Sequence, residues 1–302
     1  MMTTRRKRVN NIKPPPNMRS FHRIVTIICL ILVFGTFIIA QMRHEPTAPP
    51  PAEGEIRIHF IDVGQGDSIL VQSTEHAVLI DAGPTVIGPG LASYLEQMGI
   101  TVLNYVVATH PHADHIGGMP DILDRIRIME LWMPDTAHDT VTFERFLDAI
   151  ERNNLEITTI QAGATLSAGP IQMTAVAPNS GGHENLNNYS IVLHMRHGQT
   201  SFLFTGDAEA ISEREMIAAG WDLRADVLKV GHHGSRTSST DEFLDAVDPF
   251  AAVIMLGADN QFGHPHQEVL DRFDERGIRI MRTDELGTIV LFTDGVEIYL
   301  YE

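Results

Sequence analysis

Apolar residues recur in short runs throughout residues 55–300, and glycine, proline or aspartate separates most runs from the next. Short apolar runs bounded by such turns predict strands, whereas apolar positions three and four apart predict helices. The predicted strands cover residues 56–61, 68–71, 78–81, 102–108, 157–160, 171–177, 190–195, 201–204, 227–230, 252–256, 279–281, 288–292 and 296–300. The predicted helices cover residues 88–98, 114–126, 142–152, 208–219, 241–247 and 267–276. Two strand-rich halves with interspersed helices predict an α/β fold, a four-layer αββα sandwich with the helices on its outer faces.

A different pattern precedes this domain. Residues 24–40 carry no charge and are almost wholly apolar, and Gln41 and Met42 extend the run to a length that spans a bilayer as a helix. A basic segment before the run predicts that the amino terminus stays in the cytoplasm and that the rest faces outward. The predicted organisation is given by four ranges: a basic cytoplasmic head at 1–23, a transmembrane signal anchor at 24–42, a proline-rich linker at 43–54 and a folded domain at 55–302. A signal peptide that is cleaved to give a secreted protein is the alternative.

The predicted domain is strongly acidic. After residue 53 the chain has 14 Lys and Arg residues against 37 Asp and Glu residues, a formal charge of −23. Such a surface repels polyanions and opposes long, tight binding of nucleic acid. The only cysteine, Cys29, lies in the apolar run. The folded domain therefore has no disulfide, no cysteine-ligated zinc and no cysteine nucleophile.

Side chains that bind metals gather where predicted strands end. His110, His112, Asp114 and His115 lie within six residues, directly after the strand at 102–108. Two imidazoles separated by one residue can face one cation, and the carboxylate and third imidazole just beyond them can hold a second. Neutral imidazole and carboxylate suit Zn²⁺, and carboxylate-rich sites also accept Mn²⁺.

Two later strands also end on polar residues of this kind. Asp207 follows the strand at 201–204 in a Gly-Asp turn, where its carboxylate could bridge two cations. His232 and His233 follow the strand at 227–230 and precede Gly-Ser. The sequence therefore predicts a metal site assembled from several strand ends.

Together these residues resemble the metallo-β-lactamase-fold hydrolases. The run from His110 to His115 matches the HxHxDH signature of that family, and the resemblance spans residues 55–302. It sharpens to the hydrolase domain of ComEC-type DNA-uptake (competence) proteins through FIDVGQGDS at 60–68, KVGHHGS at 229–235 and GHPH at 263–266. A phosphorylcholine esterase subgroup shares much of this pattern and matches less well.

The resemblance implies a ligand set for up to two metals, Zn²⁺ or Mn²⁺. His110 and His112 would hold one metal, and Asp114, His115 and His233 the other. Asp207 matches the bridging aspartate, and Asp81 matches an aspartate that orients a ligand from behind.

One position departs from the wider family. Asn188 occupies the slot of a histidine ligand of the first metal, as in the ComEC-type subgroup, so that site is expected to be the weaker one. The remaining candidates are substrate or proton-transfer contacts: His232, Ser235, His264 and His266.

The expected activity is metal-assisted hydrolysis of a phosphodiester, with DNA as the candidate substrate and with the acidity of the domain as the opposing observation. Hydrolysis of small phosphodiesters or of cell-wall phosphorylcholine is the second enzymatic alternative. A non-catalytic binding or scaffold module with a degenerate metal site is the alternative of another class, and Asn188 is the feature that favours it.

Overall fold

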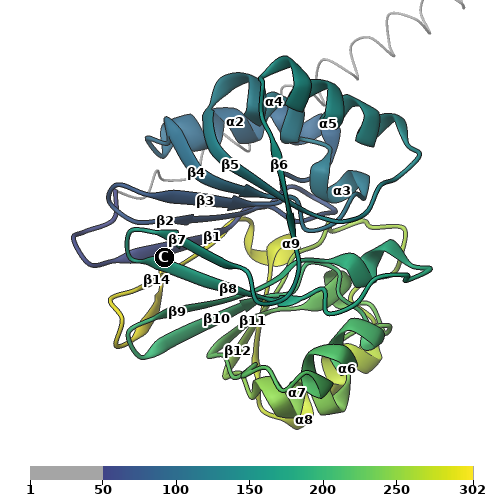
Figure 1. Ribbon diagram of the computed structural model, residues 1–302. Coiled ribbons are helices and arrows are strands. Elements are labelled where there is room, and N and C mark those ends of the chain that lie inside the picture. The colour runs from purple at the N-terminus through teal and green to yellow at the C-terminus, as the bar shows by residue number, and fades with distance from the viewer. Residues whose placement is uncertain (1–49, 302) are drawn as a thin grey trace, which may run out of the picture. The chain divides into compact units, whose positions relative to one another are not determined.

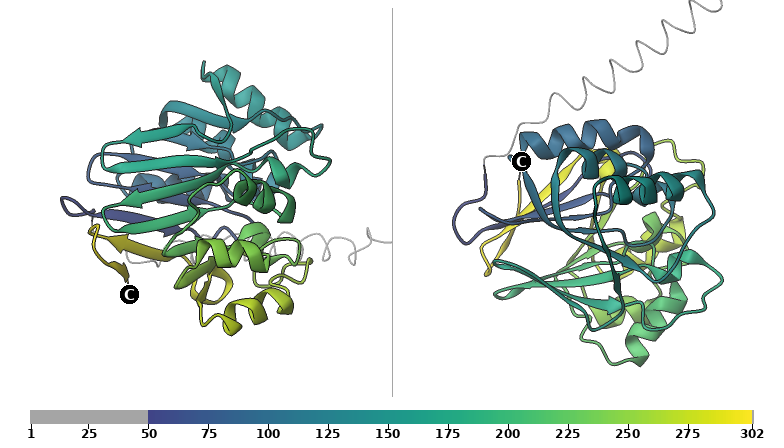
Figure 2. Two further views of the ribbon diagram at one scale, coloured as in Figure 1. Left: turned by 60° about the horizontal axis from the view of Figure 1, so that its bottom comes forward. Right: turned by 45° about the horizontal axis from the view of Figure 1, so that its top comes forward.

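Two β-sheets stacked face to face form the centre of the molecule, and helices cover the outer face of each (Figure 1). The structure is a computed structural model, and it describes residues 50–301. Figure 2 shows the same order of layers from two further sides. The α/β fold with two sheets that the sequence predicts is confirmed.

The first sheet has eight strands in the order β15-β14-β1-β2-β3-β4-β5-β6. Their bounds are β1 (Ile56–Phe60), β2 (Ile69–Gln72), β3 (Ala77–Ile80), β4 (Val102–Val107), β5 (Arg127–Pro134), β6 (Ile157–Ile160), β14 (Ile289–Thr293) and β15 (Ile298–Leu300). Strands β3, β4, β5 and β6 run parallel to one another, and the other pairs of this sheet are antiparallel.

The second sheet has seven strands in the order β13-β12-β11-β10-β9-β8-β7. Their bounds are β7 (Thr165–Ala168), β8 (Ile171–Ala177), β9 (Val192–His197), β10 (Thr200–Phe204), β11 (Val227–Lys229), β12 (Ala251–Ile254) and β13 (Arg279–Arg282). Here β10, β11, β12 and β13 form the parallel part.

Helices lie on both outer faces. The first sheet is covered by α2 (Gly88–Gln97), α3 (Ala113–Ile116), α4 (Met119–Arg125) and α5 (Val141–Arg152), and the second by α6 (Ala210–Ala218), α7 (Asp241–Val247) and α8 (Gln267–Glu275). The short elements are α9 (Thr283–Leu286) and the 3₁₀ helices η1 (Thr85–Ile87), η2 (Leu186–Tyr189) and η3 (Gly231–Gly234).

Side chains that alternate between the two faces of each strand form three apolar layers, one between the sheets and one under the helices on each side. In β10, Phe202 and Phe204 face the first sheet, whereas Leu203 between them packs under the helices of the second. Phe60 of β1 meets Phe204 across the two sheets, with ring centroids 6.2 Å apart. The period of two along each strand thus supplies one face for the inter-sheet core and one for the helices.

Three local predictions were wrong. The helix expected at 114–126 is two helices, because the backbone N–H of Gly118 donates to Gly83 and Pro120 starts α4 anew. Strands β5 and β7 were missed, because Arg127 and Glu130 in β5 and the exposed Thr165 and Ser167 in β7 obscure the apolar pattern.

The predicted basic head, signal anchor and most of the linker fall outside the described residues. Within residues 50–301 no helix is long and apolar enough to cross a bilayer.

Candidate metal centre

The polar residues expected to bind metal meet at one edge of both sheets. Asp81 follows β3 and His110 follows β4, and these strands are parallel neighbours. Asp207 follows β10 and His233 follows β11, which are parallel neighbours in the other sheet. Because the carboxyl ends of parallel strands open at the same edge, residues far apart in the sequence converge there.

Two groups of ligand atoms share this edge. One atom each from His110, His112 and Asp207 lie within 4.8 Å of one another, and so do atoms of Asp114, His115 and His233.

The carboxylate of Asp207 stands between the groups. Its Oδ2 lies 3.7 Å from Nε2 of His110 and 3.3 Å from Nε2 of His115, and its Oδ1 lies 3.5 Å from Nε2 of His233. The Asp207 carboxylate is thus within reach of both groups.

Several buried atoms at this point make no hydrogen bond to any described residue. They are Nε2 of His115, Nε2 of His233 and Oδ1 of Asp207. They have close His–Asp contacts but no good hydrogen bond, and a buried polar atom without one costs about 1–3 kcal/mol, so a cation held between them would be stabilising. The donors are imidazole nitrogens and carboxylate oxygens, the set that binds Zn²⁺ or Mn²⁺, and they therefore fit a metal.

Asp81 holds one ligand in place from behind. It accepts hydrogen bonds from the backbone N–H of Thr109 at 2.8 Å, from the Thr109 hydroxyl at 2.7 Å and from Nδ1 of His115 at 2.8 Å. This fixes the His115 tautomer and leaves Nε2 toward Asp207. Asp81 has a positive φ of 58°, a strained conformation that its three hydrogen bonds hold.

Asp67 is a member of the centre that the sequence analysis did not single out. It is buried, pairs with the buried ammonium of Lys229, and has Oδ1 3.4 Å from Nδ1 of His233. One of its oxygens also groups with atoms of His115 and Asp207 within 4.8 Å. Asp67 lies in the FIDVGQGDS motif, which indicated the resemblance to ComEC-type proteins but not a role for this aspartate in the site.

The electrostatics of the centre favour positive charge. Burial raises the pKa of Asp207, but the charges of His115 and His233 outweigh burial and hold this pKa well below its usual range. Burial lowers the pKa of His233, but Asp207 and Asp67 raise it to about 10. The carboxylates thus favour positive charge at this point, which a divalent cation would also supply.

Asn188, the expected weak ligand, has its side-chain oxygen engaged by a helix. It is buried, and its Oδ1 accepts a hydrogen bond from the backbone N–H of Ser212 at 3.2 Å. The first turn of α6 needs such acceptors, which is why the amide turns toward that helix. Ser190 approaches the centre instead, with Oγ 3.4 Å from Nδ1 of His110 and 3.1 Å from the backbone N of Asp207. Asn188 as a ligand of the first metal stays a prediction.

His232 lies beside the centre and is held by a carboxylate. Its Nδ1 is 3.0 Å from Oε1 of Glu209, and its Nε2 is 3.9 Å from Oδ2 of Asp207. Glu209, which the sequence analysis missed, also accepts from the Thr237 hydroxyl at 2.9 Å and from Nδ2 of Asn187 at 3.2 Å. Glu209 therefore holds Nδ1 of His232, and Nε2 lies near the carboxylate of Asp207.

The remaining candidates lie at the rim. The ring of His264 is 5.5 Å from that of His232 and 6.5 Å from that of His233. Nδ1 of His266 accepts the backbone N–H of Arg236 at 3.0 Å, so this ring fixes a loop.

Ser235 is buried and pairs with the hydroxyl of Thr237 at 3.0 Å, a contact that supports the loop rather than the ligands. His138, which the sequence analysis missed, lies on the other side, with its ring 5.5 Å from that of His112.

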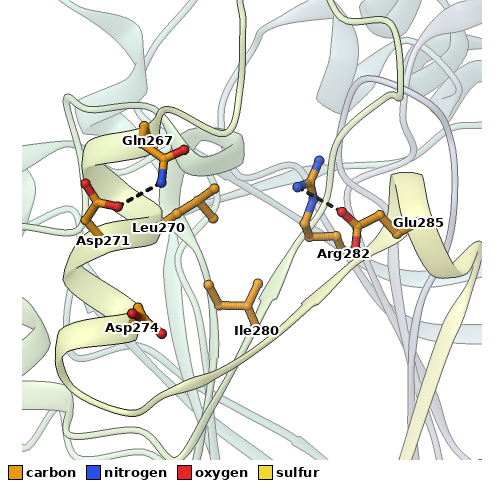
Figure 3. Close-up of a pocket in the computed structure, with 7 residues that line it drawn as sticks. All are labelled: Gln267, Leu270, Asp271, Asp274, Ile280, Arg282 and Glu285. Atoms are coloured by element: carbon orange, nitrogen blue, oxygen red, sulfur yellow. Dashed lines mark hydrogen bonds and ion pairs between the residues drawn. The ribbon is translucent and has the colours of Figure 1, made fainter.

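A shallow pocket elsewhere, between α8 and β13, shares no residue with this centre (Figure 3). Several of its polar groups satisfy one another. Gln267 donates to Asp271 at 2.8 Å, and Arg282 pairs with Glu285 at 2.9 Å. It presents no convergent set of ligand atoms.

Residues 61–258 match the family model described as the metallo-beta-lactamase superfamily. The chain belongs to this superfamily. The matched range includes every predicted ligand from His110 to His233, so the family match and the geometry concern the same site.

Two curated relatives narrow the assignment. The chain is 33% identical over 280 residues to ComE operon protein 3 of Bacillus subtilis, covering 87% of this chain and 35% of the relative. It is 29% identical over 265 residues to competence protein ComA of Neisseria gonorrhoeae, covering 82% and 33%. The resemblance to ComEC-type competence proteins is confirmed. The chain spans about a third of the length of these relatives.

A solved structure supports the fold. The metallo-beta-lactamase fold protein YhfI from Bacillus subtilis aligns with a TM-score of 0.54 and 16% identity, over 79% of this chain and all of that one. The chain thus has the fold of this superfamily, carries groups of His and Asp side chains that fit a divalent metal, and is related to competence proteins.

Proposed function

We propose that the chain is a membrane-anchored phosphodiesterase whose domain lies outside the cytoplasm and whose substrate is DNA. The observation that carries the proposal is the pair of ligand groups joined by Asp207. Cations held by these two groups would stabilise the charge on the oxygens that approach and leave a phosphorus atom. The signal anchor predicted at 24–42 supports the location, and the competence relatives support DNA.

The two groups differ in their number of donors. The second metal would be held by Asp114, His115, His233 and Asp207, and the first by His110, His112 and Asp207. Metals held there supply Lewis acidity, which polarises a phosphoryl oxygen and lowers the pKa of an attacking water. We expect one tight and one weak metal per chain, because the first group has one donor fewer.

The side chains around the metals have separate roles in the proposed reaction. Asp207 accepts a hydrogen bond from the attacking water and so orients the lone pair of that water toward phosphorus. Glu209 accepts the Nδ1 proton of His232 and leaves Nε2 on the substrate side. His232 then donates a proton to the departing sugar oxygen, a contribution of about 10²–10⁴ in rate for a positioned acid. His264 lines the same face through its contact with the His232 ring.

The acidity of the domain limits how DNA is bound. A formal charge of −23 after residue 53 does not favour a long contact with a polyanion, so the proposed substrate contact is short. The chain spans only about a third of the length of its competence relatives. The proposal therefore concerns hydrolysis and assigns no transport of DNA to the chain.

The test uses the full chain in detergent, loaded with Mn²⁺ or Zn²⁺. Single-stranded DNA, bis-p-nitrophenyl phosphate and a phosphorylcholine ester are compared as substrates, with His233→Ala as the control that lacks the tight metal. Cleavage of DNA and of the nitrophenyl ester that is lost in the control supports the proposal. Cleavage of the choline ester alone supports the cell-wall alternative, and absence of turnover with two metals bound supports a binding module.

A further inference from the structure

The loop between β12 and α8 carries an exposed aromatic ring beside the metal centre. Phe262 is 53% exposed, and its ring lies nearly parallel to that of His264, with centroids 5.7 Å apart and planes 24° apart. The His264 ring lies nearly parallel to that of His233 in turn, at 6.5 Å and 29°. Three rings with similar tilt thus lead from a predicted metal ligand to the surface.

Hydrogen bonds hold this loop in shape. The side chain of Asn260 donates to the carbonyl oxygens of Gly257 at 2.9 Å and His264 at 2.7 Å, and it accepts the backbone N–H of His264 at 2.9 Å. The segment that bears Phe262 is therefore closed on itself by one side chain. A ring presented in this way has little conformational entropy to lose when a partner stacks on it.

The end of the loop is fixed to η3. The backbone N–H of His266 donates to the carbonyl oxygen of Gly234 at 3.0 Å. Gly234 has a φ of +80°, and a Cβ there would lie 2.7 Å from Cβ of Pro265, so only glycine allows this close approach. The loop and the segment with His232 and His233 are therefore held against each other.

The groups around the stack suit an anion. The ring of His264 lies 5.5 Å from that of His232 and 4.9 Å from that of His266. Arg236 extends at the same rim, where its guanidinium is 3.5 Å from Glu268. Imidazole N–H groups beside an exposed ring offer donors for phosphate oxygens next to a face for a planar group.

We infer that Phe262, stacked on His264, is a subsite for a nucleobase adjacent to the scissile phosphate, which makes single-stranded DNA the substrate form. This inference rests on the proposed phosphodiesterase function and specifies its substrate. A base within a duplex is stacked on its neighbours and has no free face, whereas a base in a single strand can stack on an aromatic side chain. The two centroid steps place Phe262 within reach of a base one or two nucleotides from the metal centre.

The experiment compares two esters with the same leaving group. Thymidine 5′-(p-nitrophenyl phosphate) carries a base, and methyl p-nitrophenyl phosphate does not. Stacking on an aromatic side chain contributes about 1–3 kcal/mol per base, which corresponds to roughly 5- to 150-fold in affinity. For the full chain with Mn²⁺ we expect Phe262→Ala to raise KM for the thymidine ester at least about fivefold with little change in kcat. KM for the methyl ester stays unchanged, and Phe262→Trp keeps the low KM for the thymidine ester.

Phe250→Ala is the matched control. Phe250 is 56% exposed and precedes β12, whereas Phe262 follows it, so the control removes an equally exposed ring at the opposite end of the same strand. Equal KM values for wild type and Phe262→Ala on the thymidine ester overturn the subsite and leave the phosphodiesterase proposal intact.

Absence of hydrolysis of both esters by wild type overturns the phosphodiesterase proposal instead. In that case the anisotropy of a labelled oligothymidylate, titrated with the same proteins, tests the subsite separately. Weaker binding by Phe262→Ala than by Phe250→Ala supports the subsite, and equal binding overturns it.

Discussion

Lys229 forms a buried ion pair beneath the metal centre, and its removal is expected to destabilise the protein strongly. Its ammonium contacts the carboxylate of Asp67 and donates to the carbonyl oxygen of Gly206 at 2.9 Å. The side chain of Lys229 is fully buried, and that of Asp67 is 2% exposed. The ion pair joins the loop after β1 to the end of β11, and the hydrogen bond to Gly206 reaches the turn after β10, so Lys229 connects the two sheets at the site.

The perturbation is Lys229→Met, which keeps an unbranched stem and removes the charge. Breaking a buried ion pair by removing one partner costs about 3–5 kcal/mol, because the other charge is left without compensation. His233 is the remaining cationic neighbour of Asp67, with its Nδ1 at 3.4 Å, so we expect the lower part of this range. The control is Arg224→Met, whose pair with Asp248 at 2.6 Å is exposed and contributes at most about 1 kcal/mol.

Urea unfolding of the full chain in detergent, with a chelator present, measures the free energy of unfolding without a contribution from bound metal. The double variant Asp67→Asn, Lys229→Met is expected to recover part of the loss, because it leaves no uncompensated charge. A loss for Lys229→Met no larger than that for Arg224→Met would refute the reasoning. So would a double variant whose loss equals the sum of the two single losses.

Three further predictions follow from other parts of the molecule. His233→Ala is expected to remove the tight metal, whereas His232→Ala keeps this metal and lowers only the rate. Equilibrium dialysis measures the bound metal. Loss of metal in His232→Ala but not in His233→Ala would contradict the ligand assignment. Burial and, to a lesser extent, the charge of Arg57 lower the pKa of His59 to about 3 in the folded protein, from about 6.5 in the unfolded chain. The neutral His59 ring therefore contributes fully to stability above pH 6.5, and this contribution declines as the pH falls toward 3. Unfolding measured along this range should depend on pH by up to about 1.4 kcal/mol per unit more for the wild type than for His59→Gln, and identical slopes would exclude the effect. A chain that starts at Gly54 should fold without the preceding residues; a molten state of this fragment beside a folded full chain would show that the boundary is wrong.

The convergence of the candidate metal ligands could be predicted because the sequence pattern that indicates it is local. A buried strand followed at once by His110, His112, Asp114 and His115 has one simple arrangement, in which the side chains emerge at the carboxyl end. The period of two in the apolar runs likewise predicts two faces per strand, and therefore two sheets with helices outside.

The supporting contacts could not be predicted, because they join residues far apart in the sequence. Asp67 meets Lys229 across 162 positions, and nothing near either residue indicates its partner. Glu209 follows Asp207 closely, yet only the fold brings it to His232. The contact of Asn188 with α6 is of the same kind: its place in the sequence register suggests a ligand, and only the fold shows that its oxygen accepts from the first turn of that helix.

The charge of the domain and its proposed substrate are compatible only if phosphate is recognised at few points. Much of the basic side-chain complement of the described residues is already engaged by carboxylates, as in the pairs of Arg125, Arg152, Arg196, Arg224, Arg276, Arg282 and Lys229. Such engaged cations release few counterions from DNA, so affinity for a long polyanion cannot come from them. Divalent cations at the centre would supply charge at one phosphate, and the exposed ring of Phe262 would supply contact area that is independent of charge. An acidic surface with a short, cationic and aromatic site discriminates against duplex, which presents many phosphates and no free base, and favours the end or an unpaired stretch of a single strand.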